Sequence, residues 1–281
     1  MVDFIVALLN TISSGVAQSQ VDELLKTPAG YNSALYHLSL QIANSAVKPV
    51  ASIVLAIIFS LELARVSSKV DGDRELGVKM VAAAMVKVAL VFMAAQHSEL
   101  LLQGIDQAGK SIVDGFVSSA PTSGSAASMG LGDQMKDDID AAGWGGQAAC
   151  LVLLLIPYLV STAATIVFTV VILLRFVQIY MLTAFNPLPI AFIAHEETRQ
   201  WGVNYFRQYA TLVFQCATLY LAVVFYRAFA KKVMNVDGYD KKAGLVKWIT
   251  GNMTNLLLAS VLLIGIVMIA NGIAKKLFGG E

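Results

Sequence analysis

The stretch AACLVLLLIPYLVSTAATIVFTVVILL, residues Ala148–Leu174, decides the fold class because it contains no charged side chain. A helix of about 20 mostly apolar residues already crosses the hydrocarbon core of a bilayer, and this stretch is longer than that. Across all 281 residues, 57% are hydrophobic and 14% are charged, whereas about 25% of a soluble domain is charged. The composition excludes an ordinary soluble enzyme. The net charge of +1 excludes a nucleic-acid-binding protein held by bulk positive charge.

Other apolar stretches predict further membrane-spanning helices. Four of them are clear, at about 49–64, 78–95, 208–226 and 252–274. Phe176–Ala194 is also uncharged, but Asn186-Pro187-Leu188-Pro189 interrupts it, and two prolines so close together do not fit an uninterrupted helix. This segment either crosses the membrane or is re-entrant, which requires a covering of protein or a cavity. We therefore predict an all-α polytopic membrane protein with five or six transmembrane helices and one long extracytoplasmic loop.

The spans divide the chain into four predicted regions. They are N-terminal amphipathic or extramembrane helices (1–48), a first transmembrane hairpin (49–95), an extracytoplasmic loop (96–147) and a C-terminal transmembrane bundle (148–281) with the proline-broken segment. The loop holds seven acidic and two basic residues. Its first part has helical spacing from Leu101 to Phe116. Its second part, Ser118–Gly146, is rich in Gly, Ser and Ala, which predicts flexibility.

Charge predicts the orientation of the first half, because cytoplasmic loops carry an excess of Lys and Arg. The Arg65–Lys79 turn has four basic residues, so we place it inside, with the N-terminus and 96–147 outside. The second half stays open. The Arg227–Lys247 loop, which has six basic residues, lies outside if there are five spans and inside if there are six.

The motifs that usually carry catalysis have weak support in this sequence. Gly104–Ser111 matches the phosphate-loop pattern, but that mechanism needs a strand leading into a glycine-rich loop, and the preceding residues continue a helical pattern. We interpret the match as a coincidental helix. His37, His97 and His195 lie far apart and lack the spacing of metal ligands. The sequence therefore predicts no catalytic residue, no cofactor and no metal site.

Ionisable side chains inside the spans are better functional candidates, because such groups are costly in hydrocarbon and usually face a bundle interior or a cavity. Lys87 lies in the middle of its span. Glu62, Lys79 and Arg175 lie near span ends, where snorkelling to the interface is the simpler explanation. The predicted pathway or subunit-contact residues are Lys87, Arg175, Asn186, Pro187, Pro189, Glu196 and Glu197.

Two stretches carry a resemblance to a known family: RFVQIYMLTAFNPLPIAF at Arg175–Phe192 and ETRQWGVNYFR at Glu197–Arg207. They resemble the polytopic membrane subunit of type IV secretion and conjugation machines, the TrbL-like conjugal transfer proteins. Those proteins have a basic residue that closes a long span, a Tyr-rich apolar segment, a proline break and a polar helix. An aromatic-rich span follows. Upstream of Arg175, only the layout of two spans and a long loop is similar.

The resemblance implies a membrane scaffold or channel component of a type IV secretion apparatus, with no catalytic activity. It implies a homo-oligomer around a central path in the bacterial cytoplasmic (inner) membrane. The partners that it implies are the lipid bilayer, other secretion subunits including a cytoplasmic ATPase, and transiently the transferred DNA or protein. Two alternatives stay open. One is a small-solute transporter, because broken helices are a transporter device. The other is a membrane anchor of another secretion or phage-related apparatus.

Overall fold

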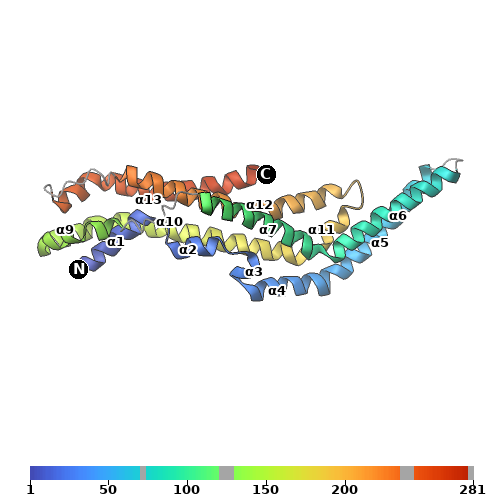
Figure 1. Cartoon of the computed structure of the whole chain (residues 1–281), viewed down its shortest axis with the longest axis horizontal. Coiled ribbons are helices and arrows are strands. Elements are labelled where there is room, and N and C mark those ends of the chain that lie inside the picture. Colours follow the sequence, from blue (N-terminus) through green and yellow to red (C-terminus); the bar gives the residue numbers. More distant parts are fainter. Residues whose placement is uncertain (70–73, 120–129, 235–243, 278–281) are drawn as a thin grey trace. The chain divides into compact units, whose positions relative to one another are not determined.

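The computed structural model describes residues 1–69, 74–119, 130–234 and 244–277, and every regular element in these ranges is a helix (Figure 1). The elements are α1 (Val2–Ser14), α2 (Gln18–Leu24), α3 (Pro28–Tyr31), α4 (Ser33–Ile42), the π-helix η1 (Ala43–Val47), α5 (Lys48–Lys69), α6 (Arg74–Gln96), α7 (Ser98–Ser119), α8 (Leu131–Gln134), α9 (Lys136–Ala141), α10 (Gly143–Phe185), α11 (Pro187–Phe192), α12 (Arg199–Val233) and α13 (Leu245–Leu277). The helical pattern expected at Leu101–Phe116 is confirmed by α7.

The predicted fold class, an all-α polytopic membrane protein, is confirmed. Six stretches are long and apolar enough to span a membrane: Val2–Leu24, Ser33–Ser67, Gly77–Gln96, Gly143–Phe185, Arg199–Ala230 and Leu245–Leu277. Five of them contain the five clear predicted spans. Phe176–Ala194 is not a separate span, because residues 176–185 continue α10 without a break at Arg175. The sixth apolar stretch is at the N-terminus instead.

A π-helical turn allows the second stretch to pass through Pro49 as one helix. Proline has no N–H to donate to the carbonyl four residues earlier, and its ring crowds that carbonyl. The turn widens into a π-helix over Ala43–Val47, which ends two residues before Pro49, and such single wide turns are the usual form of π-helix within α-helices. The Lys48 ammonium donates to the Asn44 side-chain oxygen at 2.8 Å across this turn. Pro49 therefore lies inside the span and does not begin it.

The chain folds into two compact units, of which the first comprises Met1–Leu25, Ser111–Leu174 and Gln215–Ala274. Its centre is α1, whose apolar side chains Ile5, Leu8, Leu9 and Ile12 are at most 1% exposed. Hydroxyl groups of α10 and α12 bond to the carbonyls at the end of this helix: Ser161 to Thr11 at 3.3 Å, Thr165 to Gly15 at 2.9 Å and Tyr226 to Ile12 at 3.4 Å. The apolar face of this predicted amphipathic helix is thus covered by other helices of this unit.

Part of the segment expected to be a flexible loop is helical and fastened to α1. The Asn10 side-chain oxygen accepts bonds from the N–H groups of Gly132 (2.8 Å) and Asp133 (3.3 Å) at the start of α8. The Asn10 amide donates to the Asp133 carboxylate at 3.0 Å. These bonds satisfy donors that a helix start leaves without an intrahelical partner. The rest of the expected flexible loop, 120–129, lies outside the described residues, as do 70–73 and 235–243.

The second unit comprises Lys26–Lys110, Arg175–Phe214 and Lys275–Glu281. Its α5 and α6 lie side by side as an antiparallel hairpin, and α11 packs against both (Figure 1). The contact is apolar, and Ala51, Leu55 and Ile58 of α5 are buried in it. They meet Ile190, Ala191 and Ala194 from the segment that follows the proline break. This packing positions the candidate site.

Candidate functional site

Asn186-Pro187-Leu188-Pro189 ends one helix and begins another. Helix α10 ends at Phe185, and Pro187 is the first residue of α11. The first N–H groups of a helix have no intrahelical acceptor, so proline loses nothing at these positions and its fixed φ suits a helix start. Pro189, the third residue of α11, lies in the same first turn. Both prolines therefore favour a new short helix.

This short helix forms a tight hairpin with the start of α12. We call residues 187–206 the proline hairpin. Its turn is closed by the Thr198 hydroxyl, which donates to the Phe192 carbonyl at 2.8 Å. The two arms pack closely at Gly202, where a Cβ atom would lie 2.5 Å from the Pro189 carbonyl oxygen. Glycine at this position is what allows the two backbones to approach.

The open end of the hairpin is held by two hydrogen bonds. The Ser98 hydroxyl, at the start of α7, donates to the Asn186 side-chain oxygen at 2.9 Å, and both residues are buried. The Tyr205 hydroxyl donates to the Leu182 carbonyl at 2.9 Å and so ties α12 to α10. The Asn186 side-chain nitrogen has no partner among the described residues. The end of α6 and the start of α7 therefore meet the end of α10 and the start of α11.

The turn of the hairpin carries an ionic cluster centred on Glu62. Lys87 Nζ lies 3.2 Å from Glu62 Oε1, and His195 Nδ1 lies 3.5 Å from the same oxygen. The Glu62 side chain is only 10% exposed. His195 Nε2 lies 3.9 Å from a Glu197 carboxylate oxygen. We call Glu62, Lys87, His195 and Glu197 the Glu62 cluster; it joins α5, α6 and the hairpin turn.

A second ion pair lies beside this cluster and is more exposed. Arg65 Nη1 is 2.8 Å from Glu196 Oε2, and the two side chains are 41% and 67% exposed. Exposed pairs of this kind contribute little, about 0–1 kcal/mol. This pair also attaches the hairpin turn to α5. The Glu62 side chain is much less exposed than either side chain of this pair.

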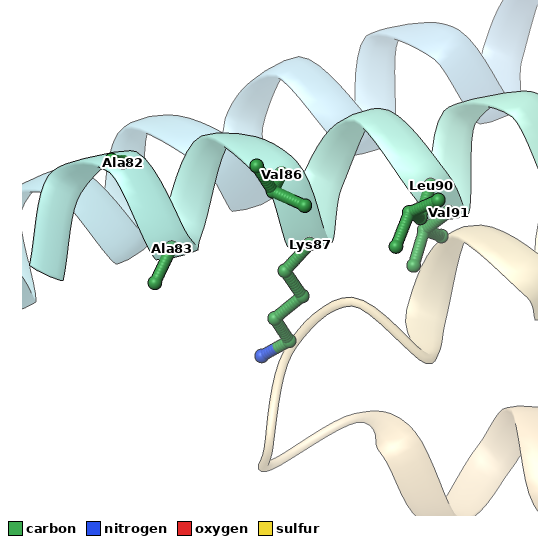
Figure 2. Close-up of a pocket in the computed structure, with 6 residues that line it drawn as sticks. All are labelled: Ala82, Ala83, Val86, Lys87, Leu90 and Val91. Carbon is green, nitrogen blue, oxygen red and sulfur yellow. The ribbon is translucent and has the colours of Figure 1, made fainter. Parts of the chain in front are cut away.

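Lys87 also borders a shallow apolar groove on α6. Figure 2 shows its side chain extending from the helix beside the other lining residues, Ala82, Ala83, Val86, Leu90 and Val91. The Lys87 side chain is 43% exposed although it is paired with Glu62. The groove thus combines small apolar residues, which allow close approach of another helix, with one accessible cation.

Arg175 belongs to a different group of side chains in the same unit. It is only 3% exposed, and its guanidinium lies 4.4 Å from the centre of the Phe176 ring. Tyr31 stacks on the Phe176 ring with centroids 3.9 Å apart. A cation over an aromatic face is a favourable arrangement. Inside a continuous helix and buried, Arg175 does not snorkel from a span end as expected.

A further polar contact joins α7 to α12 in this unit. The Tyr209 hydroxyl lies 3.1 Å from both oxygens of the Asp106 carboxylate, and Tyr209 is fully buried. Leu102 and Val213 pack in the same cluster as Tyr209. Gly109 also lies directly against Val213. Successive residues of α7 therefore meet successive residues of α12, so the two helices run parallel.

The structure brings most of the predicted site residues together, but not all of them. Asn186, Pro187 and Pro189 form the break, and Lys87, Glu196 and Glu197 converge on the hairpin turn, whereas Arg175 lies in its own group. Sequence reasoning missed Glu62, which was assigned to snorkelling, and His195, which was considered only as a metal ligand. One signal was available: Glu62 is the only acidic residue in the first clear span, 49–64.

The residues of the phosphate-loop match are helical in the structure. Gly104–Ser111 lies entirely within α7, so these residues do not form a glycine-rich loop that could cradle a phosphate. Their helical form agrees with the interpretation of a coincidental match. Among the described residues, there is no group of three or more His, Cys, Asp or Glu side chains that could hold a metal ion.

Comparison with known proteins gives one match. The family described as TrbL/VirB6 plasmid conjugal transfer like protein matches residues 13–187. This range is more than half of the chain, and it includes α5, α6 and the first two residues of the proline break, Asn186 and Pro187, as well as regions where only the layout seemed similar. No curated protein and no solved structure matches.

Proposed function

This chain belongs to the TrbL/VirB6 plasmid conjugal transfer-like family, as its sequence resemblance indicated, and on that premise we propose that it is a scaffold or channel subunit of a type IV secretion apparatus. Family membership makes it a component of a conjugal transfer system with other subunits, and its apolar helices make it a multi-pass membrane protein. In our proposal it acts as a homo-oligomer in the cytoplasmic (inner) membrane, beside a cytoplasmic ATPase, and has no catalytic activity.

The observation that carries this proposal is the uncovered surface of α6. Only 6% of the apolar window in Gly77–Gln96 is buried within the chain, whereas the other five windows are 28–50% buried. Lipid could cover the apolar side chains, but it does not suit the half-exposed Lys87 ammonium, because a charged group in hydrocarbon is costly. We therefore propose that the Lys87 face of α6 contacts other subunits or a water-filled path.

The proline hairpin supports the same role. Non-helical backbone at membrane depth requires a covering of protein or a cavity, and the hairpin turn receives its covering from α5 and α6 through the Glu62 cluster. We propose that Asn186, Pro187 and Pro189 shape one wall of the path. Arg175 stabilises that wall from within α10, and the exposed Glu196 and Glu197 face neighbouring subunits. Transient contact with transferred DNA or protein would occur along the Lys87 face.

Deletion of the gene in a donor strain tests the proposal. We expect DNA transfer to recipients to be abolished and to be restored by a plasmid-borne copy, while donor growth stays unchanged. Cross-linking in donor membranes should capture the chain with itself and with other transfer subunits. Normal transfer from the deletion strain would overturn the proposal, and a purified monomer that binds a small solute would favour a transporter.

A further inference from the structure

The carboxylate of Glu62 contacts two basic side chains from two different segments. Its Oε1 atom is 3.2 Å from Lys87 Nζ on α6 and 3.5 Å from His195 Nδ1 in the hairpin turn. The Glu62 and His195 side chains are only 10% and 14% exposed. One shielded carboxylate therefore connects the turn of the proline hairpin to the α5–α6 pair.

His195 lies between two carboxylates, one at each ring nitrogen. Nδ1 faces Glu62 at 3.5 Å, and Nε2 faces Glu197 at 3.9 Å. A neutral imidazole has one N–H and one acceptor nitrogen, whereas the imidazolium has an N–H on both nitrogens and a positive charge. Only protonated His195 is therefore attracted by both carboxylates at once. Neutral His195, with one N–H, can donate to only one of the two carboxylates and carries no charge to attract the other.

The apolar part of this contact lies on α11 and the start of α12. Its buried residues on the hairpin side are Ile190, Ala191 and Ala194, and Leu188, Phe192 and Phe206 pack partly buried against the same cluster. The turn itself, from His195 to Glu197, is attached to α5 by ionic contacts, through His195 to Glu62 and through Glu196 to Arg65. A change in the charge of His195 therefore acts on the attachment of the turn.

We propose that Glu62 and His195 form a proton-controlled clasp for the proline hairpin. Protonation of His195 closes the clasp by drawing the turn between Glu62 and Glu197, and deprotonation loosens the turn from α5 and α6. The other charged groups near His195 are Lys87 on α6, which shares Glu62, and the neighbouring Arg65–Glu196 pair. Helix α11 carries no charged side chain.

Chemical accessibility of Ala194 tests the clasp without DNA transfer, so its failure would leave the proposed function standing. Ala194 is fully buried, and Ala194→Cys should react with a maleimide only when the hairpin loosens. The parent is the full chain in detergent, with the buried Cys150 and Cys216 replaced by alanine. The exposed Gln200→Cys is the reference, because thiolate content rises with pH at any cysteine and the ratio of the two rates removes that effect.

We expect the rate ratio of Ala194→Cys to Gln200→Cys to rise roughly fivefold from about pH 5.5 to about pH 8, the range in which histidine changes charge. His195→Gln should make the ratio independent of pH. Glu62→Gln should keep it high throughout, with Glu62→Asp restoring part of the pH dependence. Glu197→Gln, at an exposed site, should reduce the rise.

Three results would overturn the clasp. The first is a parent ratio that does not change with pH. The second is an unchanged rise in His195→Gln, which would assign the pH dependence to another group. The third is an unchanged rise in Glu197→Gln, which would remove the second carboxylate from the arrangement. Because His195→Gln and Glu197→Gln keep the side-chain volume nearly constant, they test the proposal even if Glu62→Gln does not fold.

Discussion

The Ser98 hydroxyl donates a hydrogen bond of 2.9 Å to the side chain of Asn186, although 88 residues separate them in the chain. Ser98 lies two residues after the end of α6, beyond His97, and Asn186 directly follows the end of α10. The bond therefore brings the ends of two apolar helices, α6 and α10, to the same level. Helix α7 starts at this level and runs parallel to α12, as Asp106 and Tyr209 show.

This relationship predicts the membrane topology of the middle of the chain. Helix α7 packs along α10 and α12, with Leu102 in one cluster with Ile179 and Val213, whereas α6 reaches this level from the opposite side, beside α11. If α10 and α12 cross the membrane, α7, with 22 residues, is long enough to cross beside them. We expect Ser98 to lie outside and Gly124 and Gly238 to lie in the cytoplasm. The basic Arg227–Lys247 loop would then lie inside, as its six Lys and Arg residues favour.

Paired reporter fusions measure this topology. A reporter that is active only in the cytoplasm should be active after Gly124 and Gly238 and inactive after His97, and a reporter active only outside should give the reverse pattern. A fusion in the Arg65–Lys79 turn is the internal control and should be cytoplasmic. An external position for Gly124 would show that 96–147 is the extracytoplasmic loop predicted by sequence, and would contradict the crossing of α7.

The close packing of the hairpin arms predicts a destabilising substitution at Gly202. In Gly202→Ala, the added Cβ would lie 2.5 Å from both the Pro189 carbonyl oxygen and Ile193 Cγ1. Backbone atoms yield less easily than a flexible side chain, so we expect a loss of about 1–3 kcal/mol. Thermal unfolding in detergent should show a lower Tm. Gly265→Ala, in a helix where a Cβ would meet nothing within 4 Å, should leave the Tm unchanged or slightly raised. Equal Tm values for the two variants would contradict the tight contact.

The bonds of Asn10 predict a local effect in the first unit. Asn10→Ala removes the acceptor for the Gly132 and Asp133 N–H groups, and loss of such a cap costs about 0.5–2 kcal/mol. We expect faster amide hydrogen exchange across α8 and α9, with little change in α13. Ser14→Ala, an exposed residue on the same helix, is the matched control. Unchanged exchange at Gly132 in Asn10→Ala would show that α8 is held by other contacts.

The sequence predicted the helical fold well because long uncharged runs such as Ala148–Leu174 have few other stable forms in a membrane. The proline break was also predictable, because proline in a helix interior removes a backbone bond. The ionic partners were not. Glu62 and Lys87 are 25 residues apart, and His195 is much further along the chain. Their meeting depends on how the hairpin packs on α5 and α6, which no local pattern records.

The position of Lys87 predicts how its substitutions affect transfer. Lys87→Ala leaves the buried Glu62 carboxylate with only His195, and Lys87→Glu places two carboxylates together, which is unfavourable in a shielded site. We expect donor DNA transfer to fall about tenfold or more in Lys87→Ala and further in Lys87→Glu, because losing one member of a shielded pair costs more than the pair contributes. Lys87→Arg, which keeps the charge, should retain most of the transfer.

The exchange Glu62→Lys, Lys87→Glu, made in a His195→Gln chain and compared with that chain so that the swap removes no partner of His195, separates a local pair from a role for the Lys87 face itself. If the pair only holds α5 to α6, the exchanged charges should restore transfer, with membrane levels of the protein unchanged. If the Lys87 cation contacts another subunit or the transferred molecule, the exchanged chain should fold and insert normally and still fail to transfer. We expect the second result, because the Lys87 side chain is 43% exposed and its neighbour Glu62 only 10%. Full transfer by the exchanged chain would remove Lys87 from the proposed path.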